Sequence, residues 1–243
     1  MEPTLWLLAG IALLAFTLKA TTGFGPSIVF IALGSLLIEP KTLVPASSLL
    51  DLLAGGLLLR VDTEGRTLRY WLPLGVSISV GAIVGALFLD AVPAETFRRV
   101  LGWFVLGLGV WFVLGIGGGG REEHLPAKAS RLDHAMTLLG GVFGGLAGIS
   151  GPPIIWQFGR QYAKRAFRQV LVPIFFAAAV VRTIAYAGTG LVDSQTFLLA
   201  GVAVPGLLAG LYLGNRLHVN LSETVFRRVV GVVLIVVALR MNL

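Results

Sequence analysis

Cysteine is absent from this chain, and charged side chains are scarce. The 243 residues contain no cysteine, three histidines and only 13% charged residues. The lack of cysteine excludes disulfides, thiolate metal sites and a cysteine nucleophile. The histidines lie at positions 124, 134 and 218, in or beside polar connectors, and share no metal-ligand spacing. We therefore expect no metal centre, no cofactor and no enzymatic activity.

Hydrophobic residues make up 56% of the chain. They fall into blocks of roughly 17 to 23 residues, the length at which a helix crosses the hydrocarbon of a bilayer. A soluble domain of this size would not be able to bury so much apolar surface. The sequence therefore predicts an all-α, multi-pass integral membrane protein.

Two glycine-proline breaks interrupt the apolar blocks. The first runs from Thr21 to Pro26 and the second from Gly148 to Pro153. Glycine opens the backbone, and proline suits the first turn of a new helix. Inside a bilayer such irregular backbone persists only where protein or a water-filled cavity satisfies its polar groups. The breaks predict broken or re-entrant helices around a buried site.

The two halves of the chain repeat one another. Gly25-Pro26 recurs as Gly151-Pro152 at an offset of 126. Seven positions recur at an offset of 129: Gly81, Gly85, Phe97, Arg98, Arg99, Val100 and Gly102 match Gly210, Gly214, Phe226, Arg227, Arg228, Val229 and Gly231. This pattern indicates an internal duplication. We expect a first repeat of about five helical segments over 1–120, a polar linker over 121–133, and a second such repeat over 134–243.

Charge in the connectors predicts that the repeats are inverted. The basic connector of the first half follows its third segment, whereas that of the second half, expected over 160–168, follows the short segment after the break. With each short pair returning to its starting side, thirteen basic residues collect on one face and four on the other. The positive-inside rule makes the richer face cytoplasmic, which places both termini on the non-cytoplasmic side.

The breaks are the candidate binding site. Two helix N-termini that converge from inverted repeats offer unpaired amides and partial positive charge to an anion. The alternative is that the glycines only let helices pack closely. The expected substrate-binding residues at the breaks are Thr21, Thr22, Gly23, Phe24, Gly25, Pro26, Ser27, Gly148, Ile149, Ser150, Gly151 and Pro152, together with Gln157.

Three charged residues lie within apolar segments, where charge is costly and usually functional. Lys19 stands before the first break and either neutralises an anion or extends to the membrane surface. Arg182 carries a planar set of donors suited to an oxyanion; the alternative is a structural pair with a carboxylate or with helix carbonyls. Asp51 is a candidate for proton coupling, or a counter-ion for Arg182 or Lys19.

The sequence resembles the TauE/SafE sulfite-exporter-like permeases. The residues that carry the resemblance are Gly23-Phe24-Gly25-Pro26 with Pro45-Ala46-Ser47, and Gly144 to Gly151 with Pro152-Pro153. The resemblance spans essentially the whole chain. It implies a multi-spanning carrier in the plasma (inner) membrane for small sulfur-containing anions such as sulfite, sulfoacetate or related organosulfonates.

The sequence thus favours a transporter that moves a small anion by alternating access, with proton coupling through Asp51 as a weaker hypothesis. A passive anion channel, or an assembly subunit without transport of its own, fits the composition but does not explain the duplicated breaks. The expected partners are the anion and the lipid bilayer. Nucleic acid is not expected, because the basic residues lie in short connectors. Assembly into a homo-oligomer is left open.

Overall fold

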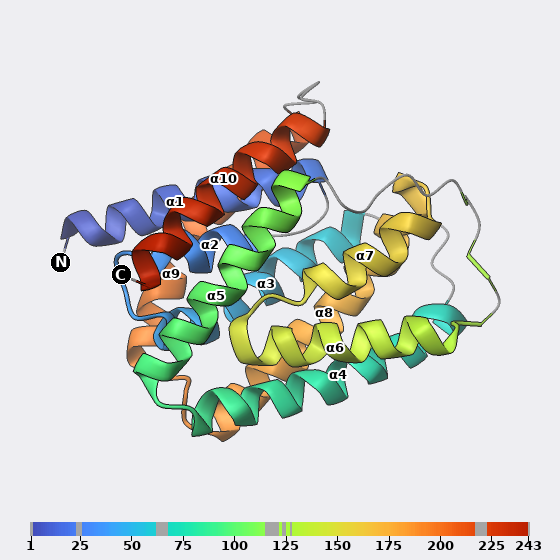
Figure 1. The fold of residues 1–243 in the computed structure, drawn as a ribbon, viewed down its shortest axis with the longest axis horizontal. Helices are drawn as coiled ribbons and strands as arrows, with labels where there is room; N and C mark the ends of the chain where they lie inside the picture. The colour runs from blue at the N-terminus through green and yellow to red at the C-terminus, as the bar shows by residue number, and fades with distance from the viewer. Residues whose placement is uncertain are drawn as a thin grey trace. The chain divides into compact units, whose positions relative to one another are not determined.

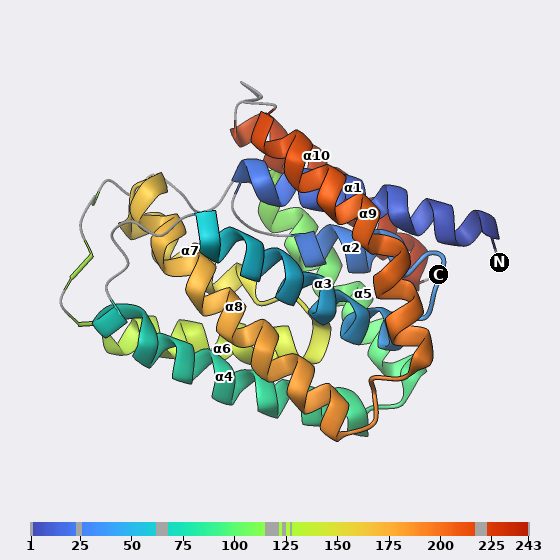
Figure 2. The same ribbon diagram turned by 180° about the vertical axis from the view of Figure 1, so that it is seen from behind.

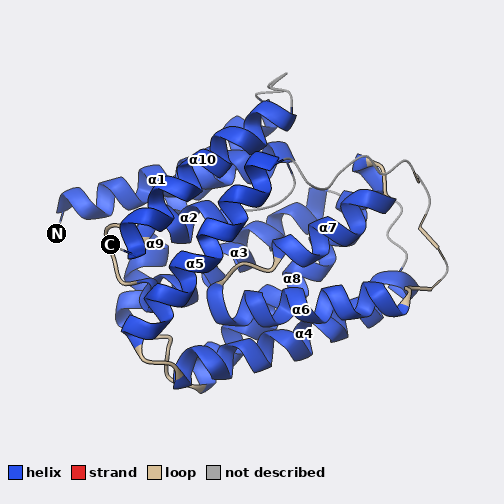
Figure 3. Ribbon diagram, viewed as in Figure 1, coloured by secondary structure: helices blue, strands red, loops and turns tan. Residues whose placement is uncertain are grey.

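The computed structural model describes residues 2–22, 26–61, 68–114, 122, 125–126, 128–216 and 223–242. Within these ranges the chain is helical except for short connections and one isolated bridge between Glu122 and Tyr162 (Figure 3). The helices, in chain order, are α1 (Glu2–Thr22), α2 (Pro26–Gly34), α3 (Pro40–Val61), α4 (Leu68–Ala91), α5 (Ala94–Leu114), α6 (Arg131–Ala147), α7 (Gly151–Gln161), α8 (Lys164–Gly188), α9 (Ser194–Arg216) and α10 (Glu223–Asn242). The expected all-α fold is confirmed.

Six of the described helices are long and apolar enough to cross a membrane: α1, α3, α4, α5, α8 and α9. By contrast, α2 has 9 residues and α7 has 11. At 1.5 Å per residue, α7 is about 16 Å long, roughly half of the hydrocarbon thickness. Each break is therefore followed by a helix too short to span the bilayer, as the sequence predicts.

The chain divides into two compact units, and each draws on both halves of the sequence (Figure 1). Unit 1 contains residues 1–50, 91–116 and 192–243, and unit 2 contains residues 51–90 and 117–191. The boundary falls inside α3, between Leu50 and Asp51. The expected division into successive repeats, and their inverted relation, stays a prediction.

In unit 1, glycines bring helices into backbone contact. A methyl group added at Gly206 or Gly210 of α9 would meet carbonyl oxygens of α1, those of Ala9 and Leu13. On α5, one added at Gly109 would lie 2.8 Å from the carbonyl oxygen of Gly231 on α10. Glycine is required at these crossings because the helix axes approach more closely than a side chain allows.

In unit 2, α4 and α6 cross in the same way (Figure 2). Methyl groups added at Gly81 and Gly85 of α4 would meet the carbonyl oxygens of Leu138 and Val142 on α6. One added at Gly145 of α6 would meet the carbonyl oxygen of Ala82 in return. The repeated glycines of α4 and α9 are therefore helix contacts, as their small-xxx-small spacing predicts.

Three helix boundaries differ from those that the sequence suggests. The segment expected from His134 begins at Arg131, because Ser130 and Asp133 form a capping box that starts α6 three residues earlier. The basic stretch expected as a connector over 160–168 is almost wholly helical: α7 continues to Gln161 and α8 begins at Lys164. Lys and Arg occur in helices as readily as in loops, so the basic composition alone misplaced the end of α7 and the start of α8.

Candidate functional site

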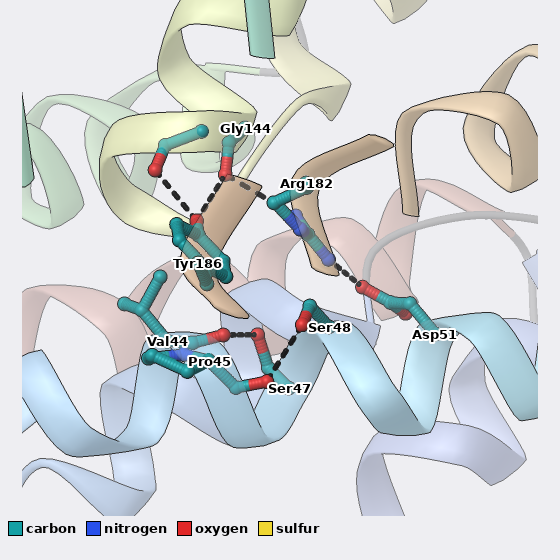
Figure 4. Close-up of polar contacts among 9 residues, drawn as sticks. Val44, Pro45, Ser47, Ser48, Asp51, Gly144, Arg182 and Tyr186 are labelled. Carbon is teal, nitrogen blue, oxygen red and sulfur yellow. Dashed lines mark hydrogen bonds and ion pairs between the residues drawn. The ribbon is translucent and has the colours of Figure 1, made fainter. Parts of the chain in front are cut away.

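Arg182 and Asp51 form a buried ion pair within unit 2 (Figure 4). Nη2 of Arg182 lies 2.8 Å from Oδ2 of Asp51, and their side chains are 4% and 13% exposed. The pair joins α8 to α3. Of the counter-ions considered for Asp51, the structure supplies Arg182.

The same face of α8 holds the end of α6. Nη1 of Arg182 donates to the carbonyl oxygen of Gly144 at 3.2 Å, and the Tyr186 hydroxyl donates to that of Gly145 at 2.6 Å (Figure 4). The last four carbonyls of a helix have no partner within it, and they form the negative end of its dipole. A cation and a hydroxyl one turn apart on α8 therefore cap the C-terminus of α6.

The Nε of Arg182 differs from its two hydrogen-bonded nitrogens. Nε is buried and has no hydrogen-bond partner among the residues that the structure describes. A buried donor without an acceptor is costly, and such groups are few in folded proteins. Of the three guanidinium nitrogens, Nε is the one without a partner among the described residues, and an ionised acceptor would bind its N–H most strongly.

The second break begins where Arg182 binds. Gly148 adopts a left-handed conformation with φ of 72°, and its N–H donates to the carbonyl oxygen of Gly144 at 2.9 Å. Ile149 N–H reaches the carbonyl oxygen of Phe143 at 3.4 Å. This is a helix stop that needs glycine at the left-handed position. The break is a hydrogen-bonded turn that starts beside the ion pair.

Ser150 caps the start of α7 without using its side chain to do so. A methyl group added at Gly144 would collide with the Ser150 hydroxyl, so glycine at 144 lets that hydroxyl lie against α6. The structure therefore brings Gly148, Ile149 and Ser150 to the helix end that Arg182 also contacts.

The N-terminus of α7 offers fewer amides than the pattern suggests. Pro152 and Pro153 occupy its first turn and carry no N–H. Two of the donors that a helix N-terminus normally presents are missing, although the dipole remains. An anion at this point would depend on Gly151, on Ser150 and on the Arg182 side chain.

Gln157 has a different neighbour. Its Nε2 donates to Oδ1 of Asp133 at 2.8 Å, and its side chain is buried. The amide nitrogen is engaged near the far end of α7 rather than at the break.

The first break is described only in part. Lys19, near the end of α1, is 8% exposed, and its ammonium lies 5.6 Å from the ring centroid of Phe16. Pro26 is buried at the start of α2, and Ser27 follows it. Gly23, Phe24, Gly25 and the side chains of Thr21 and Thr22 lie outside the described residues. This break belongs to unit 1, and its relation to the second break stays a prediction.

Sequence reasoning missed Tyr186 and the carbonyls of Gly144 and Gly145. The available signal was spacing: Tyr186 follows Arg182 by four residues, so both side chains lie on one face of α8. Asp133 was also missed because it was assigned to the linker, whereas the capping box draws it into α6.

Helices of membrane-spanning length, a short helix after a break and a buried charge pair together define a multi-pass membrane protein. The family model "Sulfite exporter TauE/SafE" matches residues 8–241. The chain belongs to this family of membrane transport proteins, as its glycine-proline motifs indicate, and the expectation that it is not an enzyme is confirmed.

Two relatives show what the chain is similar to. It is 29% identical over 228 residues to "Probable sulfite/organosulfonate exporter TauE" of Cupriavidus necator, which covers 89% of this chain and 85% of the relative. It is 29% identical over 194 residues to "Probable inner membrane transporter protein TsaS" of Comamonas testosteroni, with 79% and 76% covered. No solved structure was found to match the chain.

Proposed function

We propose that this protein carries small sulfur-containing oxyanions or organosulfonates across the cell membrane by alternating access. The family match and the name of the Cupriavidus relative support the substrate class. The observation that carries the proposal is the buried Nε of Arg182, a charged donor without a partner among the described residues, beside a broken helix. A sulfite or sulfonate group presents several oxygens, and a guanidinium binds such groups in fixed geometry.

In this proposal the second break contributes Arg182, the Ser150 hydroxyl and the Gly151 amide to the anion. We also propose the first break, from Thr21 to Ser27 with Lys19, as a substrate-binding segment; it belongs to unit 1. At the second break, Gly148 takes the left-handed conformation and Pro152 lies in the first turn of α7.

Asp51 is the proposed proton-coupling group. Its carboxylate occupies Nη2 of Arg182 at 2.8 Å, so it competes with an incoming anion for the same guanidinium. Protonation of Asp51 removes that competing charge. Anion binding would then favour uptake of a proton by Asp51, and the two would cross the membrane together.

Transport by purified protein in proteoliposomes tests the proposal. We expect saturable flux of sulfite or a small sulfonate, with counter-exchange, and loss of flux in Arg182→Gln. Arg160→Gln is the matched control, because Arg160 lies on the same unit, is exposed and stacks its guanidinium on the Trp156 ring. Flux that never saturates would indicate a channel and overturn the carrier.

A pH gradient tests the coupling separately. We expect an inward proton gradient to drive anion accumulation in the wild type and to have no effect in Asp51→Asn. Anion accumulation by the wild type that does not change with the pH gradient would contradict proton coupling but not anion transport. The substrate itself is best identified from thermal shifts with sulfite, sulfate, thiosulfate and small sulfonates, since only a bound anion raises stability.

The orientation is proposed from the connector charges. Because the chain has no natural cysteine, single cysteines can be introduced directly. We expect Lys128→Cys to react with an impermeant maleimide only from the cytoplasmic side, and Glu95→Cys only from the opposite side. The reverse labelling would invert the proposed topology.

A further inference from the structure

Asp133 is a buried carboxylate that the proposed transport site does not use. It lies in the first turn of α6, and its side chain is 3% exposed. Oδ2 accepts from the Ser130 N–H at 2.8 Å, and Oδ1 accepts from Nε2 of Gln157 at 2.8 Å. The Asp133 carboxylate thus caps the N-terminus of α6 and also accepts a hydrogen bond from α7.

Two tyrosines extend this cluster to α4. The Tyr70 hydroxyl lies 3.5 Å from Oδ2 of Asp133 and 2.9 Å from the Tyr162 hydroxyl. The two rings meet edge to face, and both residues are buried. Tyr162 is the C-cap residue of α7. Helices α4, α6 and α7 therefore meet in one hydrogen-bonded group, which we name the Asp133 cluster: Tyr70, Ser130, Asp133, Gln157 and Tyr162.

Glu122, which precedes α6, also forms backbone hydrogen bonds at the end of α7. Glu122 N–H donates to the carbonyl oxygen of Gln161 at 3.1 Å, and Ala163 N–H donates to that of Glu122 at 2.9 Å. The end of α7 is thus attached through backbone as well as side-chain hydrogen bonds.

Contacts between α6 and α7 continue to the break. Methyl groups added at Gly140 and Gly144 would collide with Ile154 and with Ser150. On α6, positions 133, 140 and 144 lie on one face, and on α7 so do 150, 154 and 157. The Asp133–Gln157 bond fixes one end of this contact, and the break lies at the other.

The sequence does not repeat these residues at the offsets of the duplication. At the offset of 126, the positions of Asp133, Gln157 and Tyr162 correspond to Leu7, Ile31 and Leu36, and at the offset of 129 Tyr70 corresponds to Leu199. All four are aliphatic. The polar side chains of the Asp133 cluster are therefore not part of the repeated sequence pattern.

We propose that Asp133 is a positioning residue that fixes α7 to α6 and α4, so that the second break keeps one shape during transport. Through Gln157, it sets where Ser150 and Gly151 lie. Gln157 acts in this attachment instead of binding the anion. The attachment of α7 through Asp133 and Gln157 does not depend on the proposed substrate; only the transport readout below rests on that function.

Hydrogen exchange of the purified protein tests the attachment. In Gln157→Leu, Asp133 loses a charge-assisted hydrogen bond, and we expect the amides of 155–161 to exchange about 10 to 100 times faster. Ser77→Ala is the matched control: it removes the 2.8 Å bond to His134, another α4–α6 contact that leaves α7 untouched. Unchanged exchange in Gln157→Leu would overturn the proposal.

Swapping the carboxylate and the amide between positions 133 and 157 separates a positioning role from simple destabilisation. Gln157→Glu alone sets two carboxylates together and should accelerate exchange further. Asp133→Asn added to it restores one amide and one carboxylate, and the oxygen of the new amide can still accept from the Ser130 N–H. We expect this double variant to regain wild-type exchange of α7. A double variant no better than Gln157→Glu alone would contradict the assignment.

Transport kinetics distinguish this role from substrate binding. In Gln157→Leu we expect the maximal flux to fall together with the faster hydrogen exchange of α7, and in the double variant Asp133→Asn/Gln157→Glu we expect both to return to wild-type values. A raised KM with normal exchange of α7 would return Gln157 to the binding site and overturn the positioning role. If neither the wild type nor any variant shows flux, the proposed transport function fails. The hydrogen-exchange data would still show whether Asp133 fixes α7, because they do not depend on transport.

Discussion

Arg182 and Asp51, 131 positions apart in the sequence, lie 2.8 Å from each other as a hydrogen-bonded ion pair. The pair connects α8 to α3 just after the unit boundary within α3. One turn earlier, Pro45 interrupts the helix ladder, and Ser47 and Ser48 donate to carbonyls three residues back. Such back-bonding and proline both bend helices. The carboxylate thus follows a weakened turn of α3.

Removing one member of the pair should destabilise the protein more than removing both. Asp51→Leu leaves the buried guanidinium without its counter-charge, at a cost of about 3–5 kcal/mol. In Asp51→Leu/Arg182→Leu no buried charge remains, and most of this stability should return. Chemical unfolding of the purified variants measures the difference. Simple additivity of the two single losses would show that the pair is not energetically coupled.

Tyr186→Phe should weaken the end of α6. The substitution keeps the ring but leaves the Gly145 carbonyl without its 2.6 Å donor, and we expect a loss of about 1–3 kcal/mol. Tyr212→Phe is the control, because Tyr212 is exposed and its ring stays available to Arg216. Equal stability of the two variants would argue against capping of α6 by α8.

The glycines at the α4–α6 crossing should not tolerate alanine. In Gly85→Ala the new methyl group meets backbone of α6, and we expect a loss of about 1–3 kcal/mol from overpacking. Gly107→Ala on α5 has nothing within 4 Å and should be neutral or slightly stabilising. Melting temperatures in one detergent compare the two. A harmless Gly85→Ala would mean that the helices separate more easily than their contacts indicate.

Asp193 should make the start of α9 sensitive to acid. Its Oδ1 accepts from the Thr196 N–H and hydroxyl, both at 2.8 Å, and these bonds hold the pKa of the carboxyl below its ordinary value of 3.8. A lowered folded-state pKa stabilises the protein above about pH 4, and the effect is lost as pH falls through the folded value. Asp193→Ala should therefore be less stable than wild type at pH 7 and approach it below about pH 4. A stability difference that does not change with pH would point to packing instead.

Sequence reasoning located the elements well where periodicity and breaker residues agree. The break at Gly148 to Pro153 appears as a left-handed glycine followed by a proline-rich helix start, because both residue types restrict the backbone locally. The start of α6 was misplaced because the charge of Asp133 is typical of a polar linker. Only the structure shows that it caps α6 through Ser130. Gln157 was expected beside a substrate; its partner, 24 residues away, is an acid whose burial no local pattern reveals.

By itself, the sequence determined that this protein is a helical membrane protein with two glycine-proline breaks, because hydropathy, glycine and proline act over a few residues. Only the tertiary structure decided which charges meet. Arg182 had a carboxylate, helix carbonyls and a substrate as equally open partners, and the packing of α8 against α6 and α3 gave it the first two. Its Nε has no partner among the described residues. Partner choice depends on distances between helices, and these arise from side-chain packing along whole helices rather than from any single stretch of the chain.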